Sequence, residues 1–120
     1  MTKINSRAKG ASGEREFAKL LRKYGYEAER GCQHSGGKDS PDVKHNMTGI
    51  HWEVKRTERL HLHDAMEQSR RDAGEDEMAA VAYRKNRTNW MVIQPFDEWI
   101  ELYQAWEKEK TNDRTIQSDK

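Results

Sequence analysis

Two carboxylates and a lysine stand at a spacing that favours metal-assisted chemistry. Asp42 precedes the turn-forming stretch Asn46–Gly49, and Glu53 and Lys55 follow it. The flanking residues predict two strands joined as a hairpin, in which Asp42 would lie directly across from Glu53. Because like charges that face each other destabilise a strand pair, this arrangement needs a compensating cation. A divalent metal ion would provide it.

Carboxylates, a bound metal ion and a lysine can together hydrolyse a phosphodiester. Mg²⁺, for which Mn²⁺ can substitute, prefers oxygen ligands, here Asp42, Glu53 and the backbone carbonyl of Val54. Such an ion lowers the pKa of a bound water and stabilises the negative charge that develops on the phosphate. Lys55 lies two residues beyond Glu53, where it could orient or deprotonate the attacking water. We therefore predict a reaction centre of Asp42, Glu53 and Lys55.

Each of these residues has a simpler interpretation when it is taken alone. Asp42 follows Pro41 and could be an ordinary turn residue, and Glu53 and Lys55 could be a solvent-facing pair on an edge strand. The joint pattern favours chemistry, because Pro-Asp followed at hairpin distance by Glu-x-Lys should arise by chance in about one chain in a hundred of this composition.

The elements that must position this centre follow from hydrophobic periodicity and turn signals. Their order is helix, strand, hairpin, helix, strand, strand, helix, which predicts an α/β fold with a central mixed β-sheet flanked by helices. Ser12 is the predicted N-cap of the first helix. The predicted helices span residues 12–24, 60–73 and the segment after Pro95, and the predicted strands span residues 26–30, 42–45, 50–56, 78–83 and 90–93.

Alternation along the strand 50–56 separates an apolar face from an ionisable face. The apolar face should join the core, and the ionisable face should hold the reaction centre. The first consists of Ile50, Trp52 and Val54, and the second of His51, Glu53 and Lys55.

The composition is that of a single small domain with a modest core. Of 120 residues, 33% are hydrophobic and 36% are charged, and the net charge is +1, so attraction to nucleic acid would depend on local segregation of charge. No apolar run approaches the ~20 residues that cross a bilayer, and the lone cysteine favours a reducing, cytoplasmic location. We expect a basic arm over residues 1–11, a folded domain over 12–110 and a disordered polar tail over 111–120.

The order of the motifs resembles the PD-(D/E)XK nuclease superfamily, and within it the archaeal-type Holliday junction resolvases and their phage-encoded relatives. The likeness covers roughly residues 7–93 and implies a restriction-endonuclease-like fold. The features that carry it are the basic segment leading into Glu14-Arg15, the Gly25-Tyr26 turn, Arg30, the Ser35-Gly36 loop, Pro41-Asp42 and Glu53-Val54-Lys55.

The resemblance also implies further members of the site. Glu14 would contact the metal directly or through water, although a glutamate in the first turn of a helix also interacts favourably with the helix dipole. Ser35 would lie near the scissile phosphate, and Gln68 beside the metal site. On position alone, Gln68 could equally be a surface glutamine.

The implied activity is that of a structure-selective DNA endonuclease, and the phage-encoded relatives imply a phage gene whose product acts in a bacterial host. Recognition would follow the branched shape of a four-way junction rather than base sequence. An enzyme that resolves junctions cuts two strands related by a two-fold axis, so a homodimer is expected. The predicted phosphate contacts are Lys9, Arg15, Arg30, Lys38 and Arg56.

Two other functions stay open at this stage. One is a nuclease of the same fold that acts on flap, nicked or linear DNA, and the other is a module that binds nucleic acid without cutting it. The complete acid and lysine set argues against the second. The stripe of Trp99, Tyr103 and Trp106 could form the dimer surface, but packing onto its own domain is the favoured interpretation because a small core needs aromatic residues.

Overall fold

The computed structural model describes the backbone of residues 6–31 and 42–118, and the side chains of 10–31 and 42–112. The element order agrees with the one predicted from the sequence. It is α1 (Ser6–Lys23), β1 (Ala28–Arg30), β2 (Val43–His45), β3 (Ile50–Arg56), α2 (Leu62–Asp72), β4 (Met78–Arg84), β5 (Met91–Ile93) and α3 (Phe96–Ser118).

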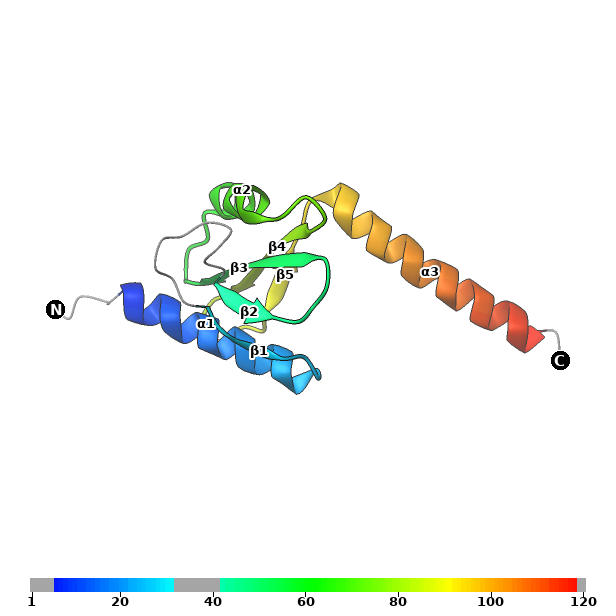
Figure 1. The fold of residues 1–120 in the computed structure, drawn as a ribbon, viewed down its shortest axis with the longest axis horizontal. Helices are drawn as coiled ribbons and strands as arrows, with labels where there is room; N and C mark the ends of the chain where they lie inside the picture. The colour runs from blue at the N-terminus through cyan, green and yellow to red at the C-terminus, as the bar shows by residue number, and fades with distance from the viewer. Residues whose placement is uncertain (1–5, 32–41, 119–120) are drawn as a thin grey trace.

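A three-stranded mixed sheet lies between two helices. Its strand order is β3-β4-β5, with β3 parallel to β4 and β4 antiparallel to β5. Helix α2 forms the crossover between the parallel strands and covers one side of the sheet, while α1 packs on the other side (Figure 1). The predicted α/β class with a flanked mixed sheet is confirmed.

The predicted hairpin between the second and third strands is wrong. Strand β2 pairs instead with β1, with Arg30 opposite Val43, in a separate two-stranded antiparallel sheet. The turn at Gly49 has φ of 81°, and the Gly49 carbonyl accepts a hydrogen bond from the Met78 amide at 2.7 Å. The turn therefore directs β3 alongside β4 rather than back along β2.

Both faces of β3 are buried, as is usual for a parallel strand covered by helices. The predicted apolar face packs toward α1, where the rings of Phe17 and Trp52 meet edge to face with centroids 5.0 Å apart. The ionisable face lies on the side of α2, which is fixed to the sheet by a hydrogen bond from Ser69 Oγ to the Ala80 carbonyl at 2.9 Å. The site residues are therefore placed in the interior rather than on a solvated strand.

Helix α1 begins at Ser6, so the predicted N-cap at Ser12 is wrong and residues 6–11 are helical. Gly13 allows this helix to pass close to the end of β3. A Cβ atom at Gly13 would lie 2.4 Å from the Cβ of Arg56. Gly13 therefore serves the packing of α1 against β3.

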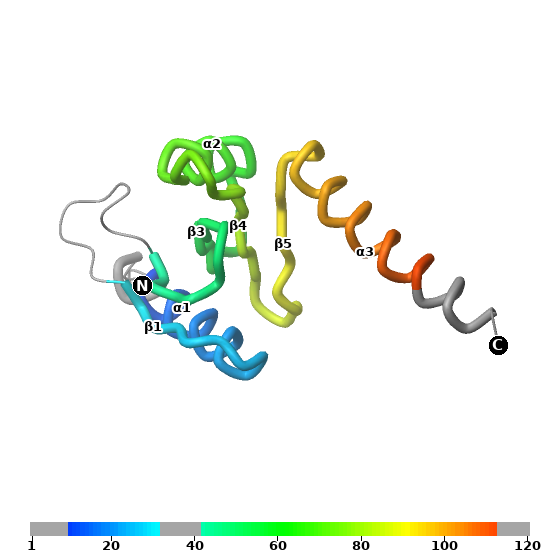
Figure 2. Tube along the Cα trace, turned by 45° about the vertical axis from the view of Figure 1, so that its right-hand side comes forward, coloured from blue at the N-terminus to red at the C-terminus, as the bar shows by residue number. Residues whose placement is uncertain are grey.

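Helix α3 projects away from the rest of the fold (Figures 1 and 2). The whole molecule, with this helix included, measures 67 × 33 × 27 Å. The aromatic residues of α3 do not pack onto the domain, contrary to the favoured interpretation, and Phe96 is 72% exposed. The helix continues to Ser118, beyond the predicted boundary at residue 110. Among the described residues, none of the helices combines the length and apolar character needed to span a bilayer.

Candidate active site

Three carboxylates from separate elements meet at one edge of β3. Glu14 comes from α1, Asp42 immediately precedes β2, and Glu53 lies in the middle of β3. Asp42 interacts electrostatically with both of the other acids and is hydrogen-bonded to Glu53. The close approach predicted for Asp42 and Glu53 is therefore present, although it arises without the hairpin.

Two hydrogen bonds donated by backbone amides hold Asp42 in place. Its carbonyl accepts from the Gly31 amide at 2.9 Å, which extends the pairing of β1 with β2. Its Oδ2 atom accepts from the Val54 amide at 2.8 Å, which joins β2 to the free edge of β3. In an extended strand the N–H and C=O groups of one residue point to the same side, so the Val54 carbonyl also lies on the Asp42 side.

Among the described residues, the cations beside the acid cluster do not offset the effects of burial and mutual repulsion on its glutamates. Burial is the largest cause of a pKa of about 8 for Glu53, followed by the charge of Asp42, while Lys55 opposes the shift. Burial and then Asp42 also raise the pKa of Glu14, with Arg30 acting in the opposite direction. An oxygen-rich site of this kind fits a hard divalent cation, which would allow both glutamates to ionise.

Lys55 lies beside the cluster at the entrance to a cleft. Its Nζ atom is 3.5 Å from Glu53 Oε1, and its side chain is about one-third exposed. The cleft has a volume of about 330 Å³, and its lining includes Lys55, Arg59, His61 and Gln68. Gln68, which sequence reasoning placed near the metal, thus shares a cleft with the lysine of the motif.

The other predicted site residues have different surroundings. Arg15 is exposed on α1, and Arg30 donates to Glu14 Oε2 at 2.9 Å. Lys9 lies in α1, but its side chain is outside the described residues. Ser35 and Lys38 also lie outside the described residues.

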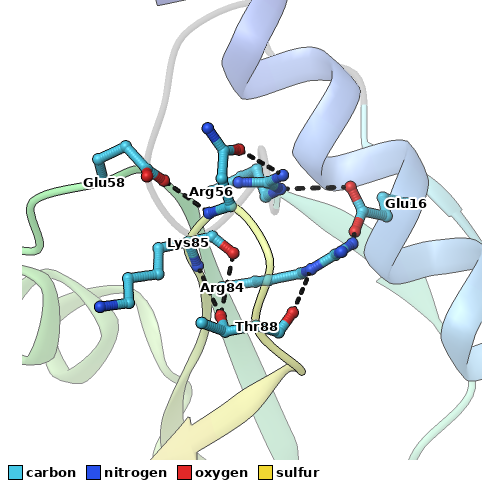
Figure 3. A network of polar contacts seen from close by, with 7 residues as sticks. Glu16, Arg56, Glu58, Arg84, Lys85 and Thr88 are labelled. Atoms are coloured by element: carbon cyan, nitrogen blue, oxygen red, sulfur yellow. Dashed lines mark hydrogen bonds and ion pairs between the residues drawn. The ribbon is translucent and has the colours of Figure 1, made fainter.

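Arg56 is held within the protein by a polar network (Figure 3). Its Nε atom donates to Glu16 Oε2 at 3.4 Å, and its Nη2 atom donates to Asn86 Oδ1 at 2.9 Å. Arg84 pairs with the same glutamate. Sequence reasoning missed this role for Glu16, because both of these arginines are far from it in the chain. The predicted contact of Arg56 with DNA stays a prediction.

A second group of possible metal ligands, which was not predicted as a site from the sequence, lies on the α2 side of Glu53. His51, Glu53 and Asp72 each place one potential ligand atom within 4.8 Å of the others. The alternation of β3 put His51 on the same face as Glu53, which was a usable signal. Asp72 gave none, because its position depends on how α2 packs on the sheet.

Comparison with known proteins places the chain in a family. The sequence model of the family described as "Phage putative PDDEXK endonuclease" matches residues 5–120. The chain belongs to this family. This phage-type endonuclease is therefore a nuclease of the PD-(D/E)XK superfamily, and the predicted superfamily is confirmed.

The fold of this endonuclease is similar to that of a solved junction resolvase. The structure of Hjc, a Holliday junction resolvase from the archaeal hyperthermophile Archaeoglobus fulgidus, matches it with a TM-score of 0.52 and 27% sequence identity. The match covers 69% of this chain and 74% of that chain. No curated protein sequence matches the chain.

Proposed function

We propose that this nuclease is a structure-selective endonuclease that hydrolyses phosphodiesters in branched DNA, with Mg²⁺ as cofactor and Mn²⁺ as a substitute. The observation that carries the proposal is the convergence of Glu14, Asp42 and Glu53 beside Lys55, in a chain similar to a junction resolvase. The enzyme would act on this branched DNA inside a bacterial cell.

The roles of the residues follow from their positions. Asp42, Glu53 and the Val54 carbonyl would hold the ion, with Glu14 binding it directly or through water. When bound, the ion supplies Lewis acidity that activates water and stabilises charge on the phosphate. Lys55 orients or deprotonates the water at the cleft entrance. Arg30 neutralises Glu14 and keeps its carboxylate turned toward the site.

Contacts with DNA are proposed for basic residues on the α1 side and in the segment before Asp42. Arg15 is exposed and suited to a phosphate, whereas Arg30 and Arg56 are also engaged by glutamates and would act partly by positioning. Lys9 and Lys38 complete the proposed phosphate contacts, and Ser35 and Gln68 the proposed support of the site.

We also propose a homodimer in which two copies pair through α3. Phe96, Trp99, Tyr103 and Trp106 form a continuous ladder of ring contacts, and they are between 40% and 72% exposed. At roughly 200 Å² for each aromatic side chain, they offer about 400 Å² of surface. This is about half of the roughly 800 Å² that each partner buries in a stable interface. The neighbouring Leu102, which is also exposed, adds further apolar surface.

The charge of α3 favours a protein partner over DNA. Its described acidic residues outnumber its described basic ones, and the acids Asp97, Glu101 and Glu107 would repel phosphates. Light scattering should give a mass near twice 14.1 kDa for the wild type and near 14.1 kDa for Trp99→Glu/Trp106→Glu. Glu101→Lys, on the opposite side of the helix, is the control. A monomeric wild type would contradict the proposal, as would a dimer that survives both tryptophan changes.

The substrate is tested by cleavage of a synthetic four-way junction, with a flap and a linear duplex of the same sequence as competitors. Paired symmetric nicks in the junction, with the competitors left intact, would support the proposal. Preferential cutting of flap or linear DNA would replace it with a nuclease of the same fold and a different target. Tight binding of the junction without metal-dependent cutting would indicate a non-cleaving module.

A further inference from the structure

We propose that His51, Glu53 and Asp72 form a second divalent-metal site, which prefers Mn²⁺ or another transition metal to Mg²⁺. The other two ligands of this α2-side site, His51 and Asp72, do not belong to the proposed Asp42–Val54 position. The α2-side site shares Glu53 with the proposed nuclease centre, but its capacity to bind a metal does not depend on the choice of DNA substrate.

The first observation is geometric. One ligand atom from each of the three residues lies within 4.8 Å of the others, a spacing that a single ion can bridge after small side-chain adjustments. The three residues come from β3 and from the last turn of α2. The carbonyl end of a helix carries partial negative charge, so Asp72 adds its carboxylate where the field already favours a cation.

The second observation is the state of His51. This side chain is 7% exposed, and its Nε2 atom is buried without a hydrogen-bond partner among the described residues. Leaving a buried polar nitrogen without a partner is costly, and such atoms in native proteins need an explanation. A bound metal ion explains it, because imidazole nitrogen is a good ligand for transition metals.

The third observation is access from solvent. His51 and Asp72 line a cavity of about 240 Å³, together with His45, Lys44 and Glu77. The cavity lies between the β2–β3 connection and the end of α2, away from the cleft of Lys55 and Gln68. An ion could therefore reach His51 and Asp72 without passing through the cleft of Lys55 and Gln68.

The ligand set favours a transition metal. Mg²⁺ is a hard ion that keeps oxygen ligands and several waters, whereas one imidazole with two carboxylates suits Mn²⁺, Fe²⁺, Co²⁺ or Zn²⁺. Glu53 and Asp72 each place a carboxylate oxygen within 4.8 Å of the other, so a cation between them would offset their like charges. A shared Glu53 carboxylate would make this a site for two ions, as in enzymes with paired metal ions.

The test uses Mn²⁺ itself as the probe, with the full chain and no DNA. Titration followed by electron paramagnetic resonance should give two Mn²⁺ per chain in the wild type and one in His51→Gln. Pulsed measurements should detect coupling to an imidazole nitrogen in the wild type and none in His51→Gln. His63→Gln, which changes an exposed histidine on α2, should behave as the wild type.

Two further variants separate this inference from the proposed function. Asp72→Asn should lose the ion with nitrogen coupling, which guards against a folding defect specific to His51→Gln. Asp42→Asn should lose the other ion and keep the nitrogen coupling. If Asp42→Asn binds Mn²⁺ as the wild type does, the proposed nuclease centre fails and the α2-side site stands. Nitrogen coupling that persists in His51→Gln, or its absence from the wild type, would overturn the inference.

Discussion

The charge state of Glu53 makes a quantitative prediction about stability in the absence of metal. Glu53 is 3% exposed and lies near Asp42 and Asp72, and its pKa is raised from 4.5 to about 8. Below pH 4.5 the carboxyl is protonated in both the folded and unfolded chains. As pH rises toward 8, the unfolded chain releases this proton and the folded chain does not, so stability is lost across that interval.

The expected size of this effect follows from the shift. One pKa unit corresponds to about 1.4 kcal/mol, so the interval from 4.5 to about 8 corresponds to a loss of roughly 3 to 5 kcal/mol. Glu53→Gln has nearly the same shape and no charge to release. With EDTA present, this variant should equal the wild type near pH 4.5 and exceed its free energy of unfolding by about 3 kcal/mol or more at pH 9.

The assay is urea unfolding followed by tryptophan fluorescence, which reports on the buried Trp52. Curves would be recorded at several pH values between 4.5 and 9, with the exposed Glu75→Gln as the matched control. Adding Mg²⁺ at pH 8 should restore the wild type and leave Glu53→Gln unchanged. If the difference between the two proteins does not grow with pH, the claim that burial and neighbouring acids strain Glu53 is refuted.

The close approach of Gly13 to β3, the proton held by Glu53 and the position of Lys55 each predict a measurable effect. Gly13→Ala places a Cβ 2.4 Å from that of Arg56 and should lower the free energy of unfolding by about 1–3 kcal/mol. The control Gly10→Ala meets nothing within 4 Å and should be neutral or stabilising. A thermal melt that ranks the two variants in the other order would contradict the packing described for α1. Because the metal must displace the proton held by Glu53, the affinity for Mg²⁺ should rise about tenfold per pH unit from pH 6 to 8 and level off above it; calorimetry that shows no pH dependence would contradict this. Lys55→Met should slow cleavage by about 100-fold or more while metal binding is retained; a loss of metal binding instead would assign Lys55 a structural role.

Local features of the fold could be predicted from the sequence. The helical spacing of Phe17, Leu20 and Leu21 and the alternation of residues 50–56 identified α1 and β3, because burial of one face is written into the residue order. The first helix was predicted to end at residue 24 and ends at Lys23, and Gly25 in the turn that follows has φ of 95°. Such features depend on near neighbours in the chain.

The pairing of strands could not be predicted, because it depends on distant segments. The short connection before Gly49 is compatible with a hairpin, yet β1 takes the edge of β2, and α2 brings β4 to β3. The meeting of Asp42 and Glu53 was expected from a register that does not exist. It occurs because Asp42 reaches the free edge of β3 through the Val54 amide.

Contacts between side chains of different elements could also not be predicted from the sequence. Nothing in the sequence tied Asp72 to His51, or Glu16 to Arg56, since each pair joins elements whose relative placement is set by the whole core. The exposed aromatic face of α3 was assigned to the core of its own domain. The spacing of its residues indicates a surface that becomes covered, but it does not indicate which molecule covers it.

The most direct test of the central claim is the single-turnover cleavage rate of a four-way junction in Mg²⁺ for wild type, Asp42→Asn and Glu53→Gln. Both substitutions should lower the rate by at least about 1,000-fold, EDTA should abolish cleavage, and Glu75→Gln should cleave at the wild-type rate. Cleavage that persists in either variant, or in EDTA, would show that the carboxylates at the edge of β3 are not the reaction centre.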